Sequence, residues 1–187
     1  MFIKSATTLD QLPDDGKPHV ALVGRSNVGK SSILNRLTDQ KGLARESADP
    51  GRTRTINVYD VDGRYDLIDL PGYGFAKASK AAWESYGDMI YEYLSGSRQL
   101  KFVLLIVDAR RNLNDIDREM VAFLESEGIP FAIVTNKMDK LSQSEIALLR
   151  RSLAADHPSV PVFQHSSVTG RGLGELRQAV EQAVRAE

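Results

Sequence analysis

The chain has no cysteine, so neither disulfides nor thiolate metal sites can form. It also lacks a long hydrophobic run, because the longest apolar stretch, residues 102–107, is far too short to cross a bilayer. The first residues, 1–5, do not contain the apolar core of a signal peptide. From these absences we expect a cytoplasmic protein that makes no use of a membrane.

An excess of charge of either sign is absent as well. The net charge is −1 and the isoelectric point is near 6.3, which gives no general attraction to nucleic acid. Any contact with RNA must then come from a local patch, and DNA binding is not expected. The length of 187 residues suits one globular domain. We expect a single domain over residues 1–187, with a short N-terminal extension at 1–18.

Strand-like apolar runs alternate with helical patterns, which is typical of an α/β fold. The pattern predicts a mostly parallel six-stranded sheet with one antiparallel strand and helices on both faces. The expected strands are residues 20–23, 56–61, 65–70, 102–107, 131–135 and 160–163. The expected helices are residues 32–37, 82–94, 115–125, 142–155 and 173–184. Asp62-Gly63 predicts a hairpin turn between the second and third strands.

Residues 24–32 form a G-x-x-x-x-G-K-[ST] phosphate loop between a strand and a helix. Backbone N–H groups and the helix dipole converge on one anion there. Lys30 can reach the β- and γ-phosphates, and the Ser31 hydroxyl can ligate Mg²⁺. The loop residues are Gly24, Arg25, Ser26, Asn27, Val28, Gly29, Lys30, Ser31 and Ser32. This pattern predicts that a polyphosphate binds here.

A second motif, Asp69-Leu70-Pro71-Gly72, lies at a predicted strand end. Asp69 can hold Mg²⁺ through water, and the Gly72 N–H can sense a γ-phosphate. In a preceding loop, residues 50–55, a hydroxyl can complete the Mg²⁺ shell when a γ-phosphate is present. The candidates there are Gly51, Arg52, Thr53, Arg54 and Thr55. A polar loop with solvated arginines is the alternative interpretation.

A third motif, Asn136-Lys137-Met138-Asp139, follows another predicted strand. A carboxylate accepts two hydrogen bonds from guanine, and adenine would leave a buried Asp139 unpaired at a cost of a few kcal/mol. Lys137 can lie over the base, and Asn136 can brace the loop. The stretch His165-Ser166-Ser167-Val168 can offer a backbone N–H to guanine O6. A simple strand-to-helix turn is the alternative.

Together these residues resemble the EngB family of bacterial ribosome-biogenesis GTP-binding proteins, within the Ras-like, translation-factor class of P-loop GTPases. The resemblance rests on GRSNVGKSS (24–32), PGRT (50–53), DLPGYGFAK (69–77), DAR (108–110), TNKMDK (135–140) and QLP (11–13). It implies Mg²⁺ ligation by Ser31 and Thr53, with Lys30, Thr53 and Gly72 serving hydrolysis. It also implies a monomer that acts on the large ribosomal subunit or its precursor, with links to cell division and septation. The chain departs from the family in its near-neutral charge and in Asn136, where many members carry Thr.

Tyr73 stands where efficient Ras-like GTPases place a water-orienting glutamine. Because a phenol can point away from the phosphate, we predict slow intrinsic hydrolysis that a partner stimulates. Asn27 allows two interpretations: it holds an activating K⁺ beside the phosphates, or it makes a hydrogen bond within the loop.

Aromatic and cationic residues are close together after Gly72: Tyr73, Phe75, Lys77, Lys80, Trp83 and Tyr86. They suit stacking on unpaired rRNA bases, although inward packing on the core is the alternative. Three functions remain open at this point. They are a GTP-driven ribosome-assembly switch, a GTP-dependent binding module with negligible hydrolysis, and a P-loop kinase, against which Asn136 and Asp139 argue.

Overall fold

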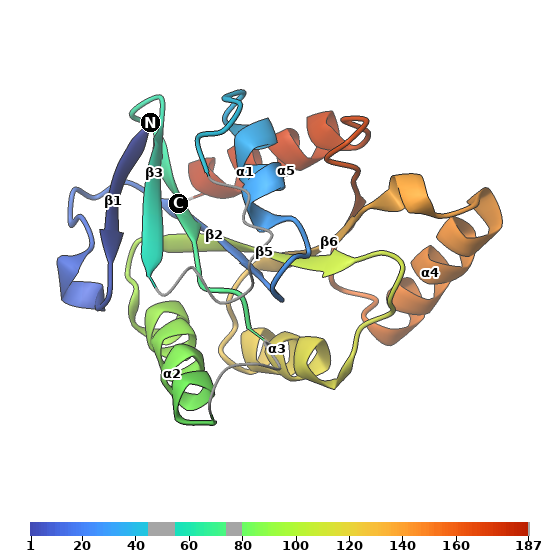
Figure 1. Ribbon diagram of the computed structural model, residues 1–187, viewed down its shortest axis with the longest axis horizontal. Coiled ribbons are helices and arrows are strands. Elements are labelled where there is room, and N and C mark those ends of the chain that lie inside the picture. Colours follow the sequence, from blue (N-terminus) through green and yellow to red (C-terminus); the bar gives the residue numbers. More distant parts are fainter. Residues whose placement is uncertain (45–54, 74–79, 187) are drawn as a thin grey trace.

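The computed structural model describes residues 1–44, 55–73 and 80–186, with the backbone alone for residues 80–86. Within these residues one sheet has the strand order β1-β3-β4-β2-β5-β6-β7 (Figure 1). Its strands are β1 (Phe2–Ala6), β2 (His19–Gly24), β3 (Ile56–Val61), β4 (Tyr65–Asp69), β5 (Leu100–Asp108), β6 (Phe131–Asn136) and β7 (Val162–Gln164). The α-helices are α1 (Lys30–Leu37), α2 (Lys80–Gly96), α3 (Asp115–Ser126), α4 (Gln143–Asp156) and α5 (Leu173–Arg185).

The sheet confirms the predicted α/β class and corrects the number of strands from six to seven. Strands β2, β4, β5, β6 and β7 run parallel, whereas β3 runs antiparallel to both β4 and β1. The additional strand, β1, lies in the segment expected to be an extension. Its residues are mostly exposed, so it has no core-facing periodicity, and its pairing with β3 stabilises it.

Apolar strands with both faces covered form the centre of the sheet. Every residue of β2 and β6 is buried, as expected for parallel strands between two helical layers. One hydrophobic cluster packs α1 and α5 against one face, and another packs α2 and α3 against the other (Figure 1). Because helices cover both faces of the sheet, the central strands are held firmly, and so are their ends, where the polar motifs lie.

Local signals in the sequence are confirmed at the ends of several elements. Asp62 and Gly63 both have positive φ (54° and 67°) in the turn between β3 and β4, across which Val61 pairs with Tyr65. Two successive positive φ values are typical of a type I′ turn. Ser142 and Glu145 form the predicted capping box of α4.

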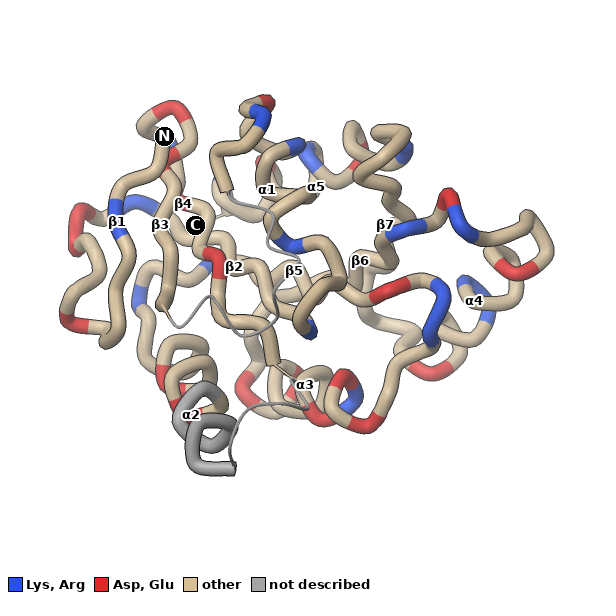
Figure 2. The backbone as a smooth tube through the Cα atoms, viewed as in Figure 1, with Lys and Arg blue, Asp and Glu red and all other residues tan. Residues whose placement is uncertain are grey.

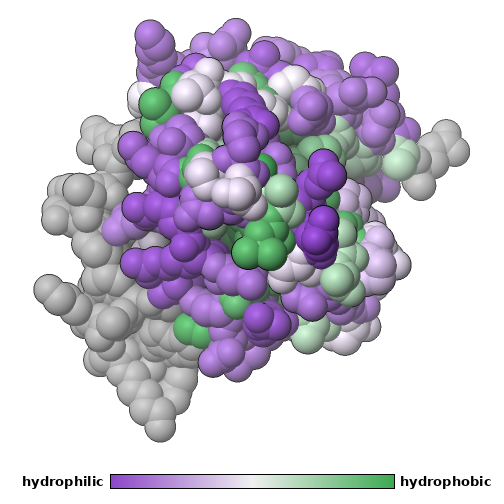
Figure 3. Space-filling model, turned by 90° about the vertical axis from the view of Figure 1, so that its right-hand side faces the viewer, coloured by the Kyte–Doolittle hydropathy of each residue, from purple (hydrophilic) through white to green (hydrophobic). Residues whose placement is uncertain are grey.

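The described surface is mixed in charge. Basic and acidic residues are interspersed along the chain (Figure 2), consistent with the net charge of −1. The face shown in Figure 3 is mostly hydrophilic with small hydrophobic areas. Among the described residues, no helix combines the length and the apolar character needed to cross a bilayer.

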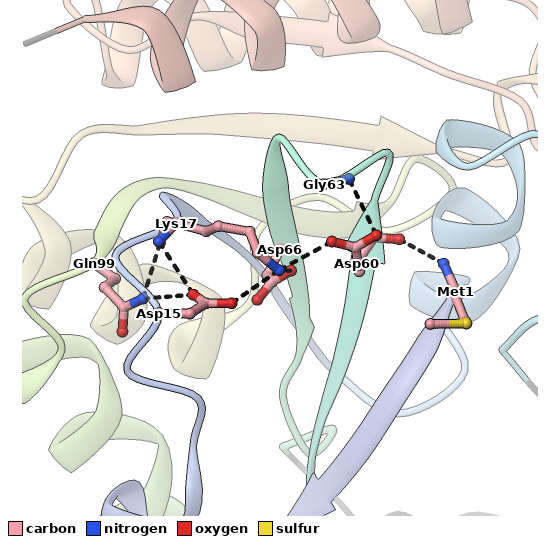
Figure 4. A network of polar contacts seen from close by, with 7 residues as sticks. All are labelled: Met1, Asp15, Lys17, Asp60, Gly63, Asp66 and Gln99. Carbon is pink, nitrogen blue, oxygen red and sulfur yellow. Dashed lines mark hydrogen bonds and ion pairs between the residues drawn. The ribbon is translucent and has the colours of Figure 1, made fainter.

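An ion network joins the segment before β2 to the sheet (Figure 4). The Lys17 ammonium lies 2.9 Å from Asp15, 3.0 Å from Asp60 and 3.3 Å from Asp66. Hydrogen bonds with Asp15 and Asp60 raise the pKa of Lys17 well above its usual range. Burial raises the pKa of Asp66, and the Lys17 charge opposes this rise. The network therefore links β3 and β4 to the chain that enters β2.

Candidate functional site

The polar motifs meet at one edge of the sheet, beyond the carboxyl ends of four neighbouring parallel strands. The register places Leu22 of β2 beside Asp69 of β4, Gly24 beside Ile106 of β5, and Asp108 of β5 beside Asn136 of β6. Ligands of open α/β sheets bind at this edge. The motifs are distant in sequence, and the parallel topology brings them together.

The phosphate loop connects β2 to α1 through backbone conformations with positive φ. Gly29 caps α1 at φ 104°, and a Cβ there would collide with the Asn136 amide. Glycine is therefore required for the loop to pack against the end of β6. Lys30 begins α1 and folds back over the loop, where its ammonium donates to the Gly24 carbonyl at 3.2 Å. This arrangement aims the loop N–H groups and the Lys30 charge at one small region.

Asp69 and Lys30 are electrostatically coupled beside the loop. Burial raises the pKa of Asp69 to about 6, and the charge of Lys30 opposes the rise. Burial also lowers the pKa of Lys30, which Asp69 opposes. The buried Asp69 Oδ1 has no hydrogen-bond partner among the described residues. An unpaired carboxylate oxygen near the first turn of α1, which carries Ser31, fits a water-coordinated Mg²⁺.

Gly72 and Tyr73 lie directly against the phosphate loop. The Ser26 N–H donates to the Tyr73 carbonyl at 3.2 Å, and Arg25 and Tyr73 form a parallel bridge. A Cβ on Gly72 would collide with the Ser26 backbone. The Tyr73 side chain is buried, and its hydroxyl donates to Asp117 Oδ1 at 2.9 Å. The phenol is therefore engaged by α3, as the sequence allowed.

Asn136 braces three segments of the site. Its amide donates to the Val28 carbonyl of the phosphate loop at 2.9 Å. Its Oδ1 accepts from the Ser167 N–H at 3.3 Å and lies 3.1 Å from His165 Nδ1. Burial lowers the pKa of His165 to about 4, with a smaller contribution from the Arg36 charge. His165 therefore supports Asn136 from within the core.

Lys137 and Asp139 follow Asn136 directly after β6 and also contact neighbouring parts of the site. The Lys137 ammonium donates to the Asn27 carbonyl at 2.6 Å and to Asp108 at 3.1 Å. Burial favours the neutral form of Asp108, yet bonds from Arg110 and Lys137 hold its pKa well below the usual range. Asp139 accepts from Ser166 Oγ at 2.6 Å. The residue as a whole is exposed, but its side chain is only 13% exposed, and its Oδ2 lies 3.6 Å from the Lys140 ammonium. The carboxylate is therefore largely covered, as expected.

Some expected contributors have side chains in the core. Leu70 and Met138 are almost fully buried, so only their backbones are available to a ligand. Thr55 lies just before β3 and donates to Asn57 Oδ1 at 3.1 Å. Outside the described residues lie Gly51, Arg52, Thr53, Arg54, Phe75 and Lys77, together with the side chains of Lys80, Trp83 and Tyr86.

Three residues near the site were not given a role from the sequence: Asp108, Asp117 and Arg36. The position of Asp108 at the end of a central strand is a usable signal, since Asp69 and Asn136 occupy equivalent ends. Asp117 and Arg36 lie inside helices, and they meet their partners only through the tertiary fold.

Comparison with known proteins agrees with this geometry. The family described as "50S ribosome-binding GTPase" matches residues 19–137. The chain is 41% identical to the probable GTP-binding protein EngB of Leuconostoc mesenteroides over 98% of this chain and 96% of that protein. It is also 41% identical to the EngB of Chlorobaculum parvum, over 96% and 94% of the two chains.

Solved structures give the same result. A crystal structure of a probable GTP-binding protein EngB aligns with a TM-score of 0.75 and 27% identity, covering 89% of this chain and 98% of that one. Era from Aquifex aeolicus, bound to GDP and aluminium fluoride, aligns with a TM-score of 0.73 and 26% identity over 88% and 56% of the two chains. With its phosphate loop and P-loop GTPase fold, this chain belongs to the EngB family of GTP-binding proteins.

Proposed function

We propose that this protein is a slow GTPase that acts as a nucleotide-dependent switch in assembly of the large ribosomal subunit. The family description, a 50S ribosome-binding GTPase, supports the partner. A related Era structure holds a nucleotide analogue with Mg²⁺ and a segment of 16S ribosomal RNA, which supports RNA as one component of the target. We further propose a cytoplasmic monomer of one domain.

In this proposal the polyphosphate lies in the loop from Gly24 to Ser32. Lys30 neutralises the β- and γ-phosphates, and the Gly72 N–H senses the γ-phosphate from its position against Ser26. Asp139 accepts hydrogen bonds from the guanine N1–H and 2-amino groups. The side chain of Asp139 is only 13% exposed. This supports the role, because a largely covered carboxylate gains more from the two guanine donors than it would in open water.

Mg²⁺ would supply charge neutralisation between the β- and γ-phosphates when it is bound. Ser31 would hold it directly, and Asp69 would hold it through water with the unpartnered Oδ1. Thr53 is proposed as a further ligand from its motif alone. A cation near Asp69 would also lower the pKa of this carboxyl from about 6.

The observation that carries the slow hydrolysis is the hydrogen bond between Tyr73 and Asp117. The side chain that replaces the usual glutamine donates its hydrogen bond to Asp117 of α3, so it does not orient a water. A ribosomal partner, a bound K⁺ near Asn27, or both would have to supply the missing transition-state stabilisation.

The test is GTP turnover by the purified protein, measured with increasing amounts of large ribosomal subunits. The proposal expects slow turnover alone and saturable stimulation by the subunit. Rapid turnover without a partner would contradict the slow-hydrolysis proposal. An absence of stimulation at saturation would favour the second candidate, a GTP-dependent ribosome-binding module with negligible hydrolysis.

A further inference from the structure

Arg36 on α1 binds the loop that follows β7. Its Nε donates to the Ser167 carbonyl at 2.9 Å, and its Nη2 donates to the Val168 carbonyl at 3.1 Å. Two donors of one planar guanidinium therefore hold two successive carbonyls. This geometry is specific to arginine, because the lysine ammonium is a point charge without a fork.

The same loop is attached on its other side to the residues proposed to read guanine. The Ser166 hydroxyl donates to Asp139 at 2.6 Å, and the Ser167 hydroxyl donates to Asn136 at 3.2 Å. The loop thus lies between Arg36 and the Asn136-to-Asp139 segment. Any shift of its backbone would move the groups that surround the proposed base.

The contact with Arg36 also fixes the direction of one peptide group. In a trans peptide the C=O and the following N–H point in opposite directions. Because the Ser167 carbonyl points at Arg36, the Val168 N–H must point away from Arg36. Among the described residues this N–H has no hydrogen-bond acceptor. It is therefore a donor of fixed direction, and the cation on its carbonyl strengthens it by polarising the peptide.

Arg36 is itself held in place. It lies near the end of the α1 helix that begins at Lys30, and Arg177 of α5 donates to the Arg36 carbonyl at 2.7 Å. A single short helix thus connects the phosphate loop to the base-proximal loop.

From these contacts we propose that Arg36 is a positioning residue for guanine recognition, which aims the peptide N–H of Val168 at the base O6. The inference rests on the proposed guanine site. Arg36 does not touch the nucleotide in this proposal and acts through the loop it holds.

The test compares Arg36→Met with the unchanged protein for binding of GDP and of 6-thio-GDP, in which a weakly accepting sulfur replaces O6. Methionine keeps an unbranched stem and removes the guanidinium. We expect GDP affinity to fall about tenfold, as for loss of one charge-assisted hydrogen bond. We expect 6-thio-GDP affinity to fall less than about threefold, because that ligand gains little from an O6 donor. The preference for GDP over 6-thio-GDP therefore shrinks.

Arg64→Met is the matched control, since Arg64 pairs with Glu181 of α5 at 2.8 Å, away from this loop. It should leave both affinities unchanged. Arg36→Lys should behave like Arg36→Met, because it lacks the fork. An unchanged GDP affinity in Arg36→Met, or equal losses for both ligands, would overturn the role of Arg36, as would full rescue by lysine. An unchanged protein that fails to prefer GDP over ADP would instead overturn the guanine site, and the inference with it.

Discussion

The hydroxyl of Tyr73 and the carboxylate of Asp117 form a buried hydrogen bond of 2.9 Å that ties the segment after Gly72 to α3. Asp117 also closes the capping box of α3 with Asn114. Burial raises the pKa of Tyr73 well above its usual value, so the phenol remains a donor at neutral pH. The same tyrosine offers its carbonyl to Ser26 in the phosphate loop. Tyr73 therefore connects two parts of the protein: its carbonyl binds the phosphate loop, and its side chain binds α3.

Replacing Tyr73 by Phe should lower the free energy of unfolding by about 1–3 kcal/mol, because it leaves the buried Asp117 with one hydrogen bond fewer. The rate of GTP hydrolysis should stay within about twofold of the unchanged protein, a shift below 0.5 kcal/mol in the barrier. Urea denaturation and single-turnover hydrolysis measure the two effects.

Tyr91→Phe is the matched control, because Tyr91 is 36% exposed and packs its ring against Phe123. Its stability should change by no more than about 0.5 kcal/mol. A Tyr73→Phe variant with unchanged stability and a large loss of hydrolysis would place the phenol in the chemistry and contradict the proposed mechanism.

Replacing Asp139 by Asn should weaken GDP binding by roughly 100-fold or more, since two hydrogen bonds to a charged acceptor are lost. The variant should gain affinity for xanthosine diphosphate, whose carbonyl at position 2 suits the new amide donor. Competition binding with both nucleotides measures the change. Unchanged GDP affinity would show that the base lies elsewhere.

Much of the fold and of the candidate site is predictable because the signals are local. The phosphate loop, the capping box of α4 and the turn at Asp62-Gly63 each carry their own backbone requirements. Apolar runs predict the central strands, since both faces of those strands are buried. The motif residues follow strands directly, so parallel topology alone brings them to one edge.

The remaining features depend on contacts between distant parts of the chain. Strand β1 exists through its pairing with β3, and its five residues carry no burial pattern of their own. The contact of Arg36 with the loop after β7 joins residues 131 positions apart. The hydrogen bond from Ser166 to Asp139 joins residues 27 positions apart. None of these has a signal within a short window of sequence.

Turnover of GTP should be faster in K⁺ than in Na⁺ if Asn27 holds a monovalent cation. Asn27 is exposed with φ 65°, and its carbonyl accepts from Lys137. Its side chain makes no hydrogen bond to another described residue, which leaves the amide oxygen available. Asn27→Ala should remove the difference between the two salts. Equal rates in both salts for the unchanged protein would favour a loop role for Asn27.

Replacing Lys17 by Met should destabilise the fold by about 2 kcal/mol, because the fully buried Asp66 loses its cation. This loss of stability is smaller than the loss expected on breaking a fully buried ion pair, because the Lys17 side chain is 26% exposed. Arg64→Met serves as the control, because Arg64 is 49% exposed in its pair with Glu181. Equal, small effects of the two substitutions in urea denaturation would show that the network in Figure 4 contributes little.

The buried imidazole of His19 should make the fold less stable in acid. Its Nδ1 lies 3.1 Å from the Tyr93 hydroxyl, and burial lowers its pKa from 6.5 to about 4. The unfolded chain therefore binds the proton first as the pH falls, so the stabilisation is complete above pH 6.5 and is lost towards pH 4. Between pH 7 and pH 5 this group should remove about 2 kcal/mol of unfolding free energy.

The measurement is urea denaturation of the unchanged protein and of His19→Asn at both pH values. The unchanged protein should lose more stability than His19→Asn, because the asparagine has no proton to bind. Tyr93→Phe is the control, since it removes the hydrogen-bond partner and keeps the imidazole buried. It should lower the stability at both pH values while preserving the difference between them. Equal pH dependence in His19→Asn and the unchanged protein would mean that another group controls acid unfolding.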